Sequence, residues 1–397
     1  MRFLQIRLVL LLVSANMASV SNSTYALADR VSVEIARLPN GAMQPEVVSD
    51  RTGVVHMVYL AGEPSAANVF YVHSADGGRS FSSPVRVNSG DGSAIATGTI
   101  RGAQIALGRN GRVHVAWNGS DRAQPKPPPD PITKRDGMPM LYARMNPATG
   151  KFEPQRNLMT RSTNLDGGGS IAADDRGSVY VAWHGNGVDG GGEESRRVWI
   201  ARSLDDGQTF AKEAAISDPA TGVCGCCALR LFADPRGDLH MLYRSATNKA
   251  HRDIYSLRSR DRARTFTGGR VQGWEIGACP MTSTSIAGGK QLLGAWETDG
   301  QVYFAPLEET DRFSAPPVAD TSESARRKHP RLAVNRSGMV LLTWTEGTSW
   351  ARGGSLAWQA FTPDGNPTTV KGSRPGVPVW SFSAVVARPD GSFAIFY

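Results

Sequence analysis

The sequence has few of the features that mark membrane-spanning, helical or nucleic-acid-binding proteins. Beyond residue 28, no hydrophobic run approaches the roughly 20 residues that a membrane-spanning helix requires. No long stretch places apolar residues at helical spacing. The 44 Lys and Arg residues are scattered, and no nucleic-acid motif accompanies the net charge of +8. We therefore expect no membrane span, no nucleic-acid partner and no organic cofactor.

The longest apolar run lies at the N-terminus. Arg2 and Arg7 come first, the run Leu8–Val13 follows, and the small residues of Ala26–Ala28 precede Asp29. This order is that of a secretory signal peptide, and the run is too short to span a membrane. We predict a signal peptide at 1–28 and a single domain at 29–397, in a periplasmic or secreted monomer.

One pattern is repeated along the rest of the chain: an apolar run, a turn ending in Gly, and a second apolar run that ends near an aromatic. Six copies occupy residues 44–59, 104–117, 170–183, 230–243, 331–344 and 384–397, and a weaker copy without the turn Gly occupies 284–296. Each copy is typical of a β-hairpin, with a second hairpin between copies. A four-stranded unit repeated at this period predicts an all-β propeller. We expect seven four-stranded blades, with six as the alternative, closed by the N-terminal strand Val31–Arg37.

The turns of the outer hairpins carry a more specific motif, Ser-X-Asp-X-Gly-X-Ser/Thr-Phe. It occurs at Ser74–Phe81 and Ser203–Phe210, and again at Ser259–Phe266 with Ala263 in place of Gly. The Asp and Ser side chains can accept hydrogen bonds from backbone N–H groups of the turn, and the Gly allows a left-handed conformation.

This motif resembles the Asp-box, or bacterial neuraminidase (BNR) repeat, of the sialidase-like β-propeller superfamily. The resemblance covers nearly all of residues 31–397. It implies a glycan or glycoconjugate partner and, if the protein is an enzyme, a glycosidase of exo-alpha-sialidase type that removes terminal acidic sugars. Sialidases usually have six blades, however, and Asp-boxes also occur in propellers without glycosidase activity. A non-catalytic glycan- or protein-binding propeller is therefore the alternative.

Aligning the repeats predicts which residues meet around the propeller axis. Near the start of each inner strand, the seven copies carry Glu46, Gln104, Ser170, Arg230, Thr284, Arg331 and Ala384. Slightly earlier in the chain come Arg101, Asp166, Cys226, Cys227, Cys279 and His329. Because equivalent positions of inner strands lie at one height, we expect both groups at one end of the channel, where convergent polar residues favour a ligand site.

The resemblance assigns roles to these residues. Arg101, Arg230 and Arg331 would bind a sugar carboxylate, assisted by Gln104 and His329. The catalytic acid/base would be Asp166, and its partner carboxylate Glu46 or Glu275.

Two parts of the family pattern are not matched. The Arg-Ile-Pro motif of the first inner strand corresponds here to Gln44–Glu46, which contains no Arg, and Arg37–Pro39 lies too early in the chain. No Tyr nucleophile is placed by a motif; Tyr243 and Tyr303 are the candidates.

Two insertions accompany these repeats. Residues 121–136 are rich in Pro and residues 185–194 are rich in Gly, and either loop could overhang a binding face.

All four cysteines fall in two loops of adjacent blades: Cys224, Cys226 and Cys227 in one, and Cys279 in the other. An even number of cysteines in an exported protein favours disulfides. Because neighbouring Cα atoms are only about 3.8 Å apart, a bond between Cys226 and Cys227 is disfavoured. We predict one bond within the first loop, from Cys224, and one bond from Cys226 or Cys227 to Cys279.

A metal or redox site is the alternative, with these cysteines and His329 as ligands of Cu(I) or Zn(II). The cysteine spacing matches none of the common zinc patterns, so we expect no metal in the first instance.

Overall fold

The computed structural model describes residues 31–39, 41–187, 189–248, 250–308, 313–317 and 325–397. The predicted signal peptide, residues 1–28, lies outside this range. In the described part of the chain, no helix has the length and apolar character needed to cross a membrane. Helical structure is restricted there to three short 3-10 turns, η1 (Arg109–Gly111), η2 (Glu193–Ser195) and η3 (Pro219–Thr221).

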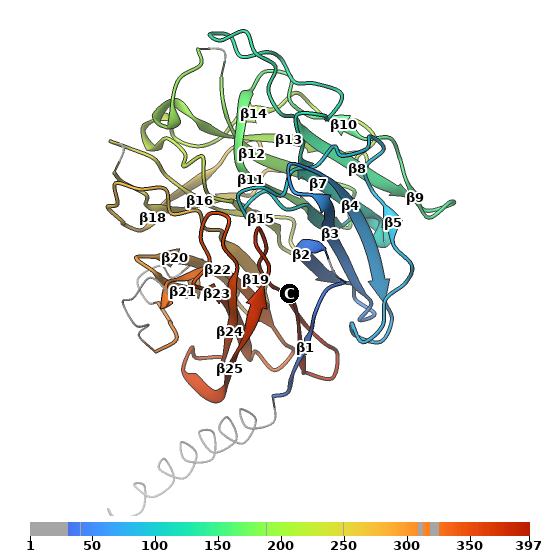
Figure 1. The fold of residues 1–397 in the computed structure, drawn as a ribbon, viewed down its shortest axis with the longest axis vertical. Helices are drawn as coiled ribbons and strands as arrows, with labels where there is room; N and C mark the ends of the chain where they lie inside the picture. The colour runs from blue at the N-terminus through green and yellow to red at the C-terminus, as the bar shows by residue number, and fades with distance from the viewer. Residues whose placement is uncertain (1–30, 40, 188, 249, 309–312, 318–324) are drawn as a thin grey trace, which may run out of the picture.

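The chain forms seven sheets arranged around a central axis, as the repeats predict (Figure 1); their strand pairs are antiparallel except where the N-terminal strand joins the last sheet. Blades 1 and 2 comprise β2 (Ala42–Ser49), β3 (Val55–Glu63), β4 (Ala66–Ser74) and β5 (Val85–Arg86), then β6 (Gln104–Leu107), β7 (Val113–Asn118), β8 (Met140–Asn146), β9 (Lys151–Phe152) and β10 (Arg156–Asn157). Blades 3 and 4 comprise β11 (Thr163–Ala173), β12 (Val179–Asn186), β13 (Arg197–Ser203) and β14 (Ala214–Ala215), then β15 (Arg230–Ala233), β16 (Leu239–Arg244), β17 (Ile254–Ser259) and β18 (Thr267–Gln272).

Blades 5 and 6 comprise β19 (Ser285–Gly288), β20 (Leu292–Thr298) and β21 (Gln301–Pro306), then β22 (Arg327–Val334), β23 (Val340–Glu346), β24 (Gly354–Phe361) and β25 (Pro367–Val377). Blade 7 comprises β26 (Ala384–Ala387), β27 (Phe393–Phe396) and β1 (Val33–Ala36). Within the described residues, blades 5 and 7 therefore have three strands and the others at least four.

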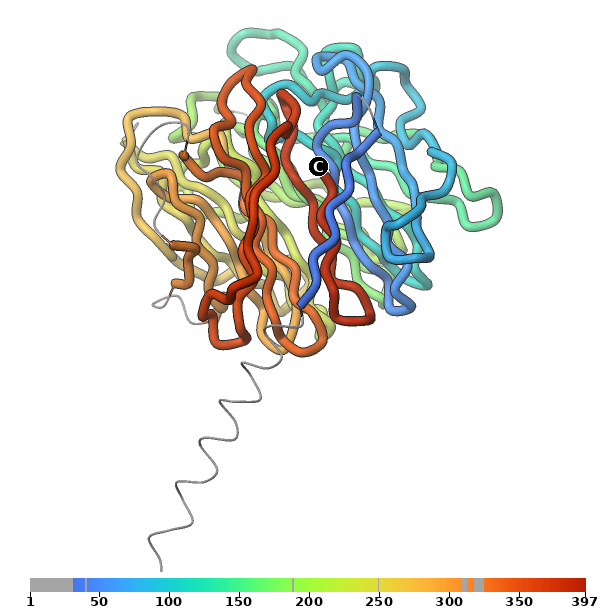
Figure 2. Tube along the Cα trace, turned by 60° about the horizontal axis from the view of Figure 1, so that its bottom comes forward, coloured from blue at the N-terminus to red at the C-terminus, as the bar shows by residue number. Residues whose placement is uncertain are grey.

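The ring is closed by the N-terminal strand, as predicted. β1 pairs in parallel with β27, from Val33 opposite Phe393 to Ala36 opposite Phe396. Figure 2 shows this first strand, in blue, running beside the red C-terminal hairpin. The first strands of successive blades contact one another all the way round, including β26 of blade 7 with β2 of blade 1. The seven inner strands therefore surround one axis.

The hydrophobic core lies between neighbouring blades. One cluster joins Val58 and Val69 of blade 1 to Val115 and Trp117 of blade 2, and equivalent clusters fill the other interfaces. The aromatic near the end of each repeat contributes strongly: Trp117, Trp183 and Trp296 are fully buried. Because each blade buries both faces against its neighbours, the alternation of small and large apolar residues in the repeats specifies the packing.

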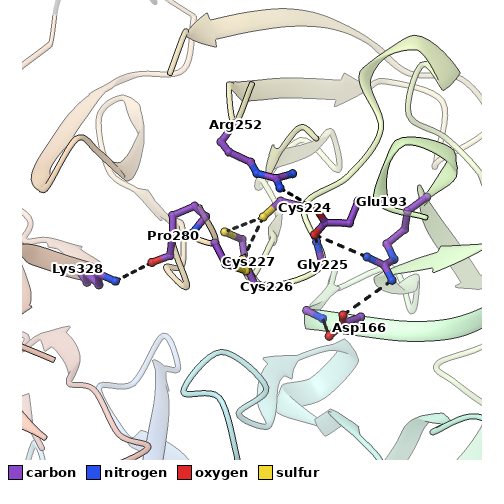
Figure 3. The surroundings of a disulfide bond; sticks show 12 residues. Asp166, Glu193, Cys224, Gly225, Cys226, Cys227, Arg252, Pro280 and Lys328 are labelled. Atoms are coloured by element: carbon purple, nitrogen blue, oxygen red, sulfur yellow. Dashed lines mark hydrogen bonds and ion pairs between the residues drawn. A yellow bond between two sulfur atoms is a disulfide. The ribbon is translucent and has the colours of Figure 1, made fainter. Parts of the chain in front are cut away.

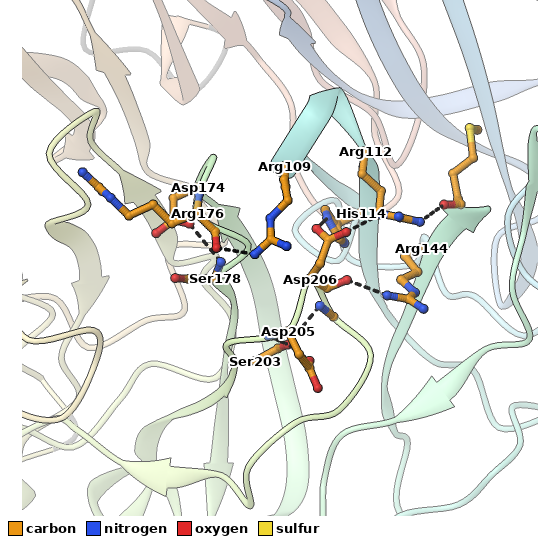
Figure 4. A network of polar contacts seen from close by, with 12 residues as sticks. Arg109, Arg112, His114, Arg144, Asp174, Arg176, Ser178, Ser203, Asp205 and Asp206 are labelled. Atoms are coloured by element: carbon orange, nitrogen blue, oxygen red, sulfur yellow. Dashed lines mark hydrogen bonds and ion pairs between the residues drawn. The ribbon is translucent and has the colours of Figure 1, made fainter. Parts of the chain in front are cut away.

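The turn at Ser203–Phe210, which carries the Ser-X-Asp-X-Gly motif, connects adjacent blades. Within the turn at Ser203–Phe210, Asp205 accepts hydrogen bonds from the N–H and the hydroxyl of Thr209. The next residue, Asp206, points out of the turn toward blade 2 (Figure 4). There its carboxylate lies 2.5 Å from Arg112 Nε and 3.4 Å from His114 Nε2.

These contacts also hold the histidine in the blade. His114 is completely buried, and its Nδ1 lies 2.8 Å from the Tyr142 hydroxyl. Burial lowers the pKa of His114, although the hydrogen bond to Asp206 opposes that shift. His114 is therefore a packing residue within the blade.

We expect Asp206→Ala to destabilise the fold. The substitution leaves the Arg112 guanidinium and buried His114 without their carboxylate, at a cost of about 2 kcal/mol. The midpoint of thermal unfolding should fall measurably. The matched control is Asp175→Ala, because Asp175 pairs with Arg51 on an exposed surface and such pairs contribute little. Equal midpoints for the two variants would contradict this role for Asp206.

Candidate functional site

The structure brings the aligned charged positions together near the axis. Glu46 Oε1 lies 2.7 Å from Arg230 Nη2, and Glu46 Oε2 lies 3.4 Å from Arg331 Nη2. Arg230 Nη1 also donates to Gln104 Oε1 at 2.6 Å. Residues separated by up to 285 positions in the chain thus form one cluster, which we call the axial ion cluster (Glu46, Gln104, Arg230 and Arg331).

Backbone irregularities aim two of these side chains at the axis. The pairing of β2 with β3 is interrupted between Met43 and Glu46, and that of β22 with β23 between Lys328 and Arg331. Gln44 and His329, each two residues before the charged residue, have positive φ values of 52° and 54°. These are β-bulges, which redirect a side chain relative to the regular pleat.

The axial ion cluster is buried and internally neutralised. Burial raises the pKa of Glu46, but the charges of Arg230 and Arg331 outweigh it and hold that pKa below its usual value. Burial lowers the pKa of Arg331, whose guanidinium also lies 4.4 Å from the centre of the Phe382 ring. The two guanidinium groups that the sequence assigned to a substrate carboxylate therefore already bind a carboxylate of the protein.

The cluster lies at the inner end of the central channel. A cavity of about 1060 Å³ runs from Glu46, Arg230 and Arg331 to the hairpin turns that include Asp50 and Gly111. At the other end, the segments that lead into the inner strands hydrogen-bond to one another across blades, through Gly168 N to Cys227 O (3.1 Å) and Ala228 N to Thr282 O (3.0 Å). Gly168 is required there, because a Cβ would lie 2.6 Å from the Cβ of Ala228.

A second polar cluster lies at the end of the axis where the inner strands begin, which we call the strand-start end. Arg101 Nη2 lies 2.6 Å from Asp166 Oδ1, and Arg196 Nη2 lies 3.8 Å from Asp166 Oδ2. Arg196 Nη1 in turn lies 4.0 Å from Glu193 Oε1. The Asp166 side chain is 36% exposed and that of Glu193 34%. Two accessible carboxylates therefore flank one guanidinium group.

Sequence reasoning predicted Arg101 and Asp166 at this end but missed the aromatic pair beside them. Trp350 lies in the loop between β23 and β24, is 56% exposed, and meets the Trp380 ring edge-on at 4.8 Å. Gly98 lies against both side chains: a Cβ atom built on it would be 2.7 Å from Arg101 Nη1 and 3.5 Å from Trp350 Cζ3. The Trp350 indole therefore lies next to the Arg101 guanidinium. The sequence signal that could have indicated this pair was the lone Trp in the loop between β23 and β24. Its neighbours in space come from other blades, so the signal could not be interpreted.

The two predicted insertions meet at this end of the molecule. Asn164, two residues before Asp166, donates a hydrogen bond to Asp130 of the Pro-rich insertion. A Cβ on Gly190 would fall within 3 Å of Ile132 Cγ1, so the Gly-rich insertion packs against the Pro-rich one. Ile132 itself is 65% exposed.

Other predicted site residues lie elsewhere. Glu275 is exposed in the loop before β19, where its backbone pairs with that of His251. His329 is buried against Phe382, with its Nδ1 3.5 Å from the Ser283 hydroxyl. Of the candidate nucleophiles, Tyr243 is buried against Tyr255 within blade 4.

Tyr303 is half-buried against Phe313 in blade 5. Burial raises the pKa of Tyr303 and raises that of Tyr243 to about 12, which makes both phenols poor nucleophiles.

The cysteines converge beside the strand-start end, but with one disulfide instead of the two predicted (Figure 3). Cys226 is bonded to Cys279, across blades 4 and 5. Cys224 and Cys227 are free, buried thiols. Cys224 Sγ lies 3.3 Å from Cys226 Sγ and 3.4 Å from Cys227 Sγ, so it contacts both sulfurs and is bonded to neither.

The two free thiols differ in acidity. The hydrogen bond to Cys227, together with burial, raises the pKa of Cys224. Burial raises the pKa of Cys227 as well, but the Cys224 hydrogen bond and the Arg244 charge bring it below its usual value.

Comparison with known proteins points to one fold. No protein-family model matches the sequence, and no curated protein matches it either. The Hadza microbial sialidase Hz136 matches with 14% identity and a TM-score of 0.53, over 82% of this chain and 66% of that one. The Trypanosoma rangeli sialidase in complex with the inhibitor DANA matches with 11% identity and a TM-score of 0.52, over 81% and 56%. The GH93 alpha-L-arabinofuranosidase of Fusarium graminearum matches with 11% identity and a TM-score of 0.52, over 84% and 98%.

The chain has the fold of the sialidase-like propeller superfamily. It spans less than two thirds of the length of these two sialidases and nearly all of the arabinofuranosidase. At such identities the likeness concerns the fold, and activity has to be argued from the site.

We expect Glu46→Gln to destabilise the protein near neutral pH by about 3 kcal/mol, because it leaves two buried guanidinium groups uncompensated. Since the folded pKa of Glu46 is lowered, its contribution is complete above the unfolded value of about 4.3 and is lost as the pH falls through the folded value. The difference in unfolding midpoint between the wild type and Glu46→Gln should therefore shrink on acidification. The exposed Glu275→Gln is the control; a pH-independent difference for Glu46→Gln would contradict the ion cluster.

Proposed function

We propose that this protein is an exported sialidase-like propeller that binds the terminal, acidic sugar of a glycan at the strand-start end and cleaves its glycosidic bond, as an exo-glycosidase of exo-alpha-sialidase type. One observation carries the proposal: an exposed indole, Trp350, lies next to Arg101, whose guanidinium holds the accessible carboxylate of Asp166.

The chemistry of this group suits a sugar. A sugar ring presents a face of C–H groups that packs against an aromatic ring, and a half-exposed Trp offers such a face together with an N–H donor. An acidic substituent would share Arg101 and Arg196 with Asp166, to which both are paired, and Asp166, unlike Glu46, is accessible. The overhanging insertions would cover one side of the bound sugar, as binding sites in concave surfaces require.

Two carboxylates are available for hydrolysis. Most glycosidases use a pair of Asp or Glu residues, one as general acid and the other as base or nucleophile. Asp166 is the proposed acid/base group, and Glu193, on the other side of Arg196, is the proposed partner. Glu46 is less suitable because it is 6% exposed and is held by Arg230 and Arg331.

The test is a screen of the mature protein against chromogenic sialosides, glycuronides and α-L-arabinofuranosides. We expect turnover of an acidic glycoside that Asp166→Asn and Glu193→Gln each reduce by at least about 100-fold, the scale of general acid–base catalysis. Trp350→Ala should weaken substrate binding, measured as KM, by about tenfold. Leu204→Ala removes an exposed apolar side chain from an Asp-box, 47% exposed against 56% for Trp350, and is the matched control.

A non-catalytic binding propeller is the second candidate, and one observation favours it. Arg230 and Arg331, which a sialidase would use to bind the substrate carboxylate, are neutralised by Glu46. On this alternative, wild-type protein retains acidic oligosaccharides on a glycan array, Trp350→Ala loses them, and no product forms. Absence of both binding and turnover would contradict the two proposals together.

A further inference from the structure

Four sulfur atoms from two blades converge at one point beside the strand-start end. We call this group, Cys224, Cys226, Cys227 and Cys279, the sulfur cluster. The Sγ atoms of Cys224, Cys226 and Cys227 all lie within 4.8 Å of one another. The fourth, of Cys279, is bonded to Cys226 Sγ, and the two cysteines are 53 positions apart in sequence. One disulfide needs only two of these sulfurs, so it does not explain why the other two are buried against it.

We propose that the sulfur cluster is a binding site for a thiophilic closed-shell metal ion, Zn²⁺ or Cu⁺, and that the Cys226–Cys279 disulfide is its oxidised, metal-free form. Thiolate sulfur is the preferred ligand of both ions. None of its ligands belongs to the Arg101–Asp166 group, so metal binding can be tested without reference to the proposed glycosidase activity.

The sulfur positions suit such an ion. Four thiolates at the usual Zn–S distance of about 2.3 Å are about 3.8 Å from one another in a tetrahedron. The distances from Cys224 Sγ, 3.3 Å to Cys226 and 3.4 Å to Cys227, need to lengthen by only a few tenths of an ångström. The Cys279 Sγ, which is bonded to Cys226 in the oxidised form, has to move away from it by more than an ångström once the bond is reduced. Cys224 and Cys227 are almost completely buried, whereas Cys279 is exposed, which leaves a route by which an ion and a reductant can enter.

Cations outnumber carboxylates around the sulfur cluster: Arg244, Arg252 and Lys328 lie there with Glu193 and Glu297. A zinc ion with four thiolates, or a cuprous ion with three, has a net charge of −2 and needs nearby cations when buried. Arg252 lies in electrostatic range of Cys224, and Arg244 and Lys328 of Cys227. Lys328 Nζ donates to Pro280 O at 2.7 Å, directly beside Cys279 (Figure 3).

Unused donors surround the same point. Among the described residues, Arg252 Nε and Nη1 and Arg244 Nε are buried and lack a hydrogen-bond partner. Arg244 and Arg252 are only 1% and 6% exposed. Hydrogen bonds from such neighbours to the ligand sulfurs are what orients and stabilises a metal site.

Metal binding at this site requires that the disulfide is reduced first. A phosphine or dithiol reductant gives two electrons to the Cys226–Cys279 bond, and two protons complete two new thiols. Zn²⁺ then displaces four thiol protons to form a tetrathiolate complex, or Cu⁺ displaces three to form a trithiolate complex. Either ion would then link the loops of blades 4 and 5 in place of the disulfide.

Metal binding at the sulfur cluster would also affect the positions of Glu193 and Asp166. Glu193 accepts hydrogen bonds from Gly225 N, within the cysteine loop, and from Arg252 Nη2, both at 2.8 Å. Because Arg196 lies between Glu193 and Asp166, the conformation of the cysteine loop helps to position both carboxylates.

The experiment uses the mature chain, reduced with a phosphine and freed of excess reagent under anaerobic conditions. We expect one equivalent of Zn²⁺ or Cu⁺ to be retained against a chromophoric chelator. Co²⁺, used in place of Zn²⁺, should give sulfur-to-metal charge-transfer absorption. The air-oxidised protein of the same sequence is the matched control and should retain no stoichiometric metal, because only two of its thiols are free. Separate titrations with Zn²⁺ and Cu⁺ decide which ion the site prefers.

Cys224→Ser and Cys227→Ser should each weaken metal binding by at least about 100-fold, with near-UV circular dichroism reporting whether the variants fold. If both variants fail to fold, the Co²⁺ spectrum of the wild type still decides the question. Failure of the reduced wild type to bind either ion stoichiometrically, a Co²⁺ spectrum without sulfur bands, or unchanged affinity in a folded serine variant would overturn the proposal.

Discussion

Closure of the ring is the constraint on which the rest of this structure depends. The first strands of the first and last blades, β2 and β26, lie side by side, and β1 completes the last blade by pairing with β27. Val33 and Ile35 of β1 pack into the core of blades 6 and 7 with Phe393 and Ile395. Once the ring is closed, all seven inner strands lie at the same height along the axis and run in the same direction. The segments that lead into these strands therefore all lie at the same end of the axis.

The two ends of that axis have different chemistry. At the hairpin-turn end, a channel runs inward to the axial ion cluster. The guanidinium groups of that cluster are neutralised by Glu46, so they contribute to the stability of the fold more than to ligand recognition. The strand-start end collects accessible carboxylates, an exposed indole and two insertions. Accessible polar and aromatic side chains therefore concentrate where entry segments and strand-connecting loops meet, while the regular strands supply rigid support.

Much of the fold could be predicted because its determinants are local and repeated. A turn glycine such as Gly177, with a φ of 87°, and a buried aromatic such as Trp183 occur at matching places in the repeats. Repetition then identifies the blades and, through the alignment, the meeting of Glu46 with Arg230 and Arg331. The alignment did not indicate that these three residues neutralise one another, because it gives positions and not the direction or burial of each side chain.

The candidate site was only partly predictable for the same reason. Arg101 precedes β6 and Asp166 lies near the start of β11, so the repeat register located them. Trp350 lies in a loop between β23 and β24, where the register carries no information. Of the two predicted disulfides, only the one that joins the two loops is present. The number and spacing of the cysteines indicate which loops meet, but not which sulfur atoms face each other.

By itself, the sequence determined the propeller architecture of this protein and the strand that closes it, and favoured seven blades over six, because hairpin periodicity and turn chemistry act over a few residues. Only the tertiary structure decided which charges are buried in pairs, which carboxylates remain accessible and how four sulfurs converge. These outcomes depend on side chains brought together from different blades, and their distances and desolvation are properties of the assembled ring.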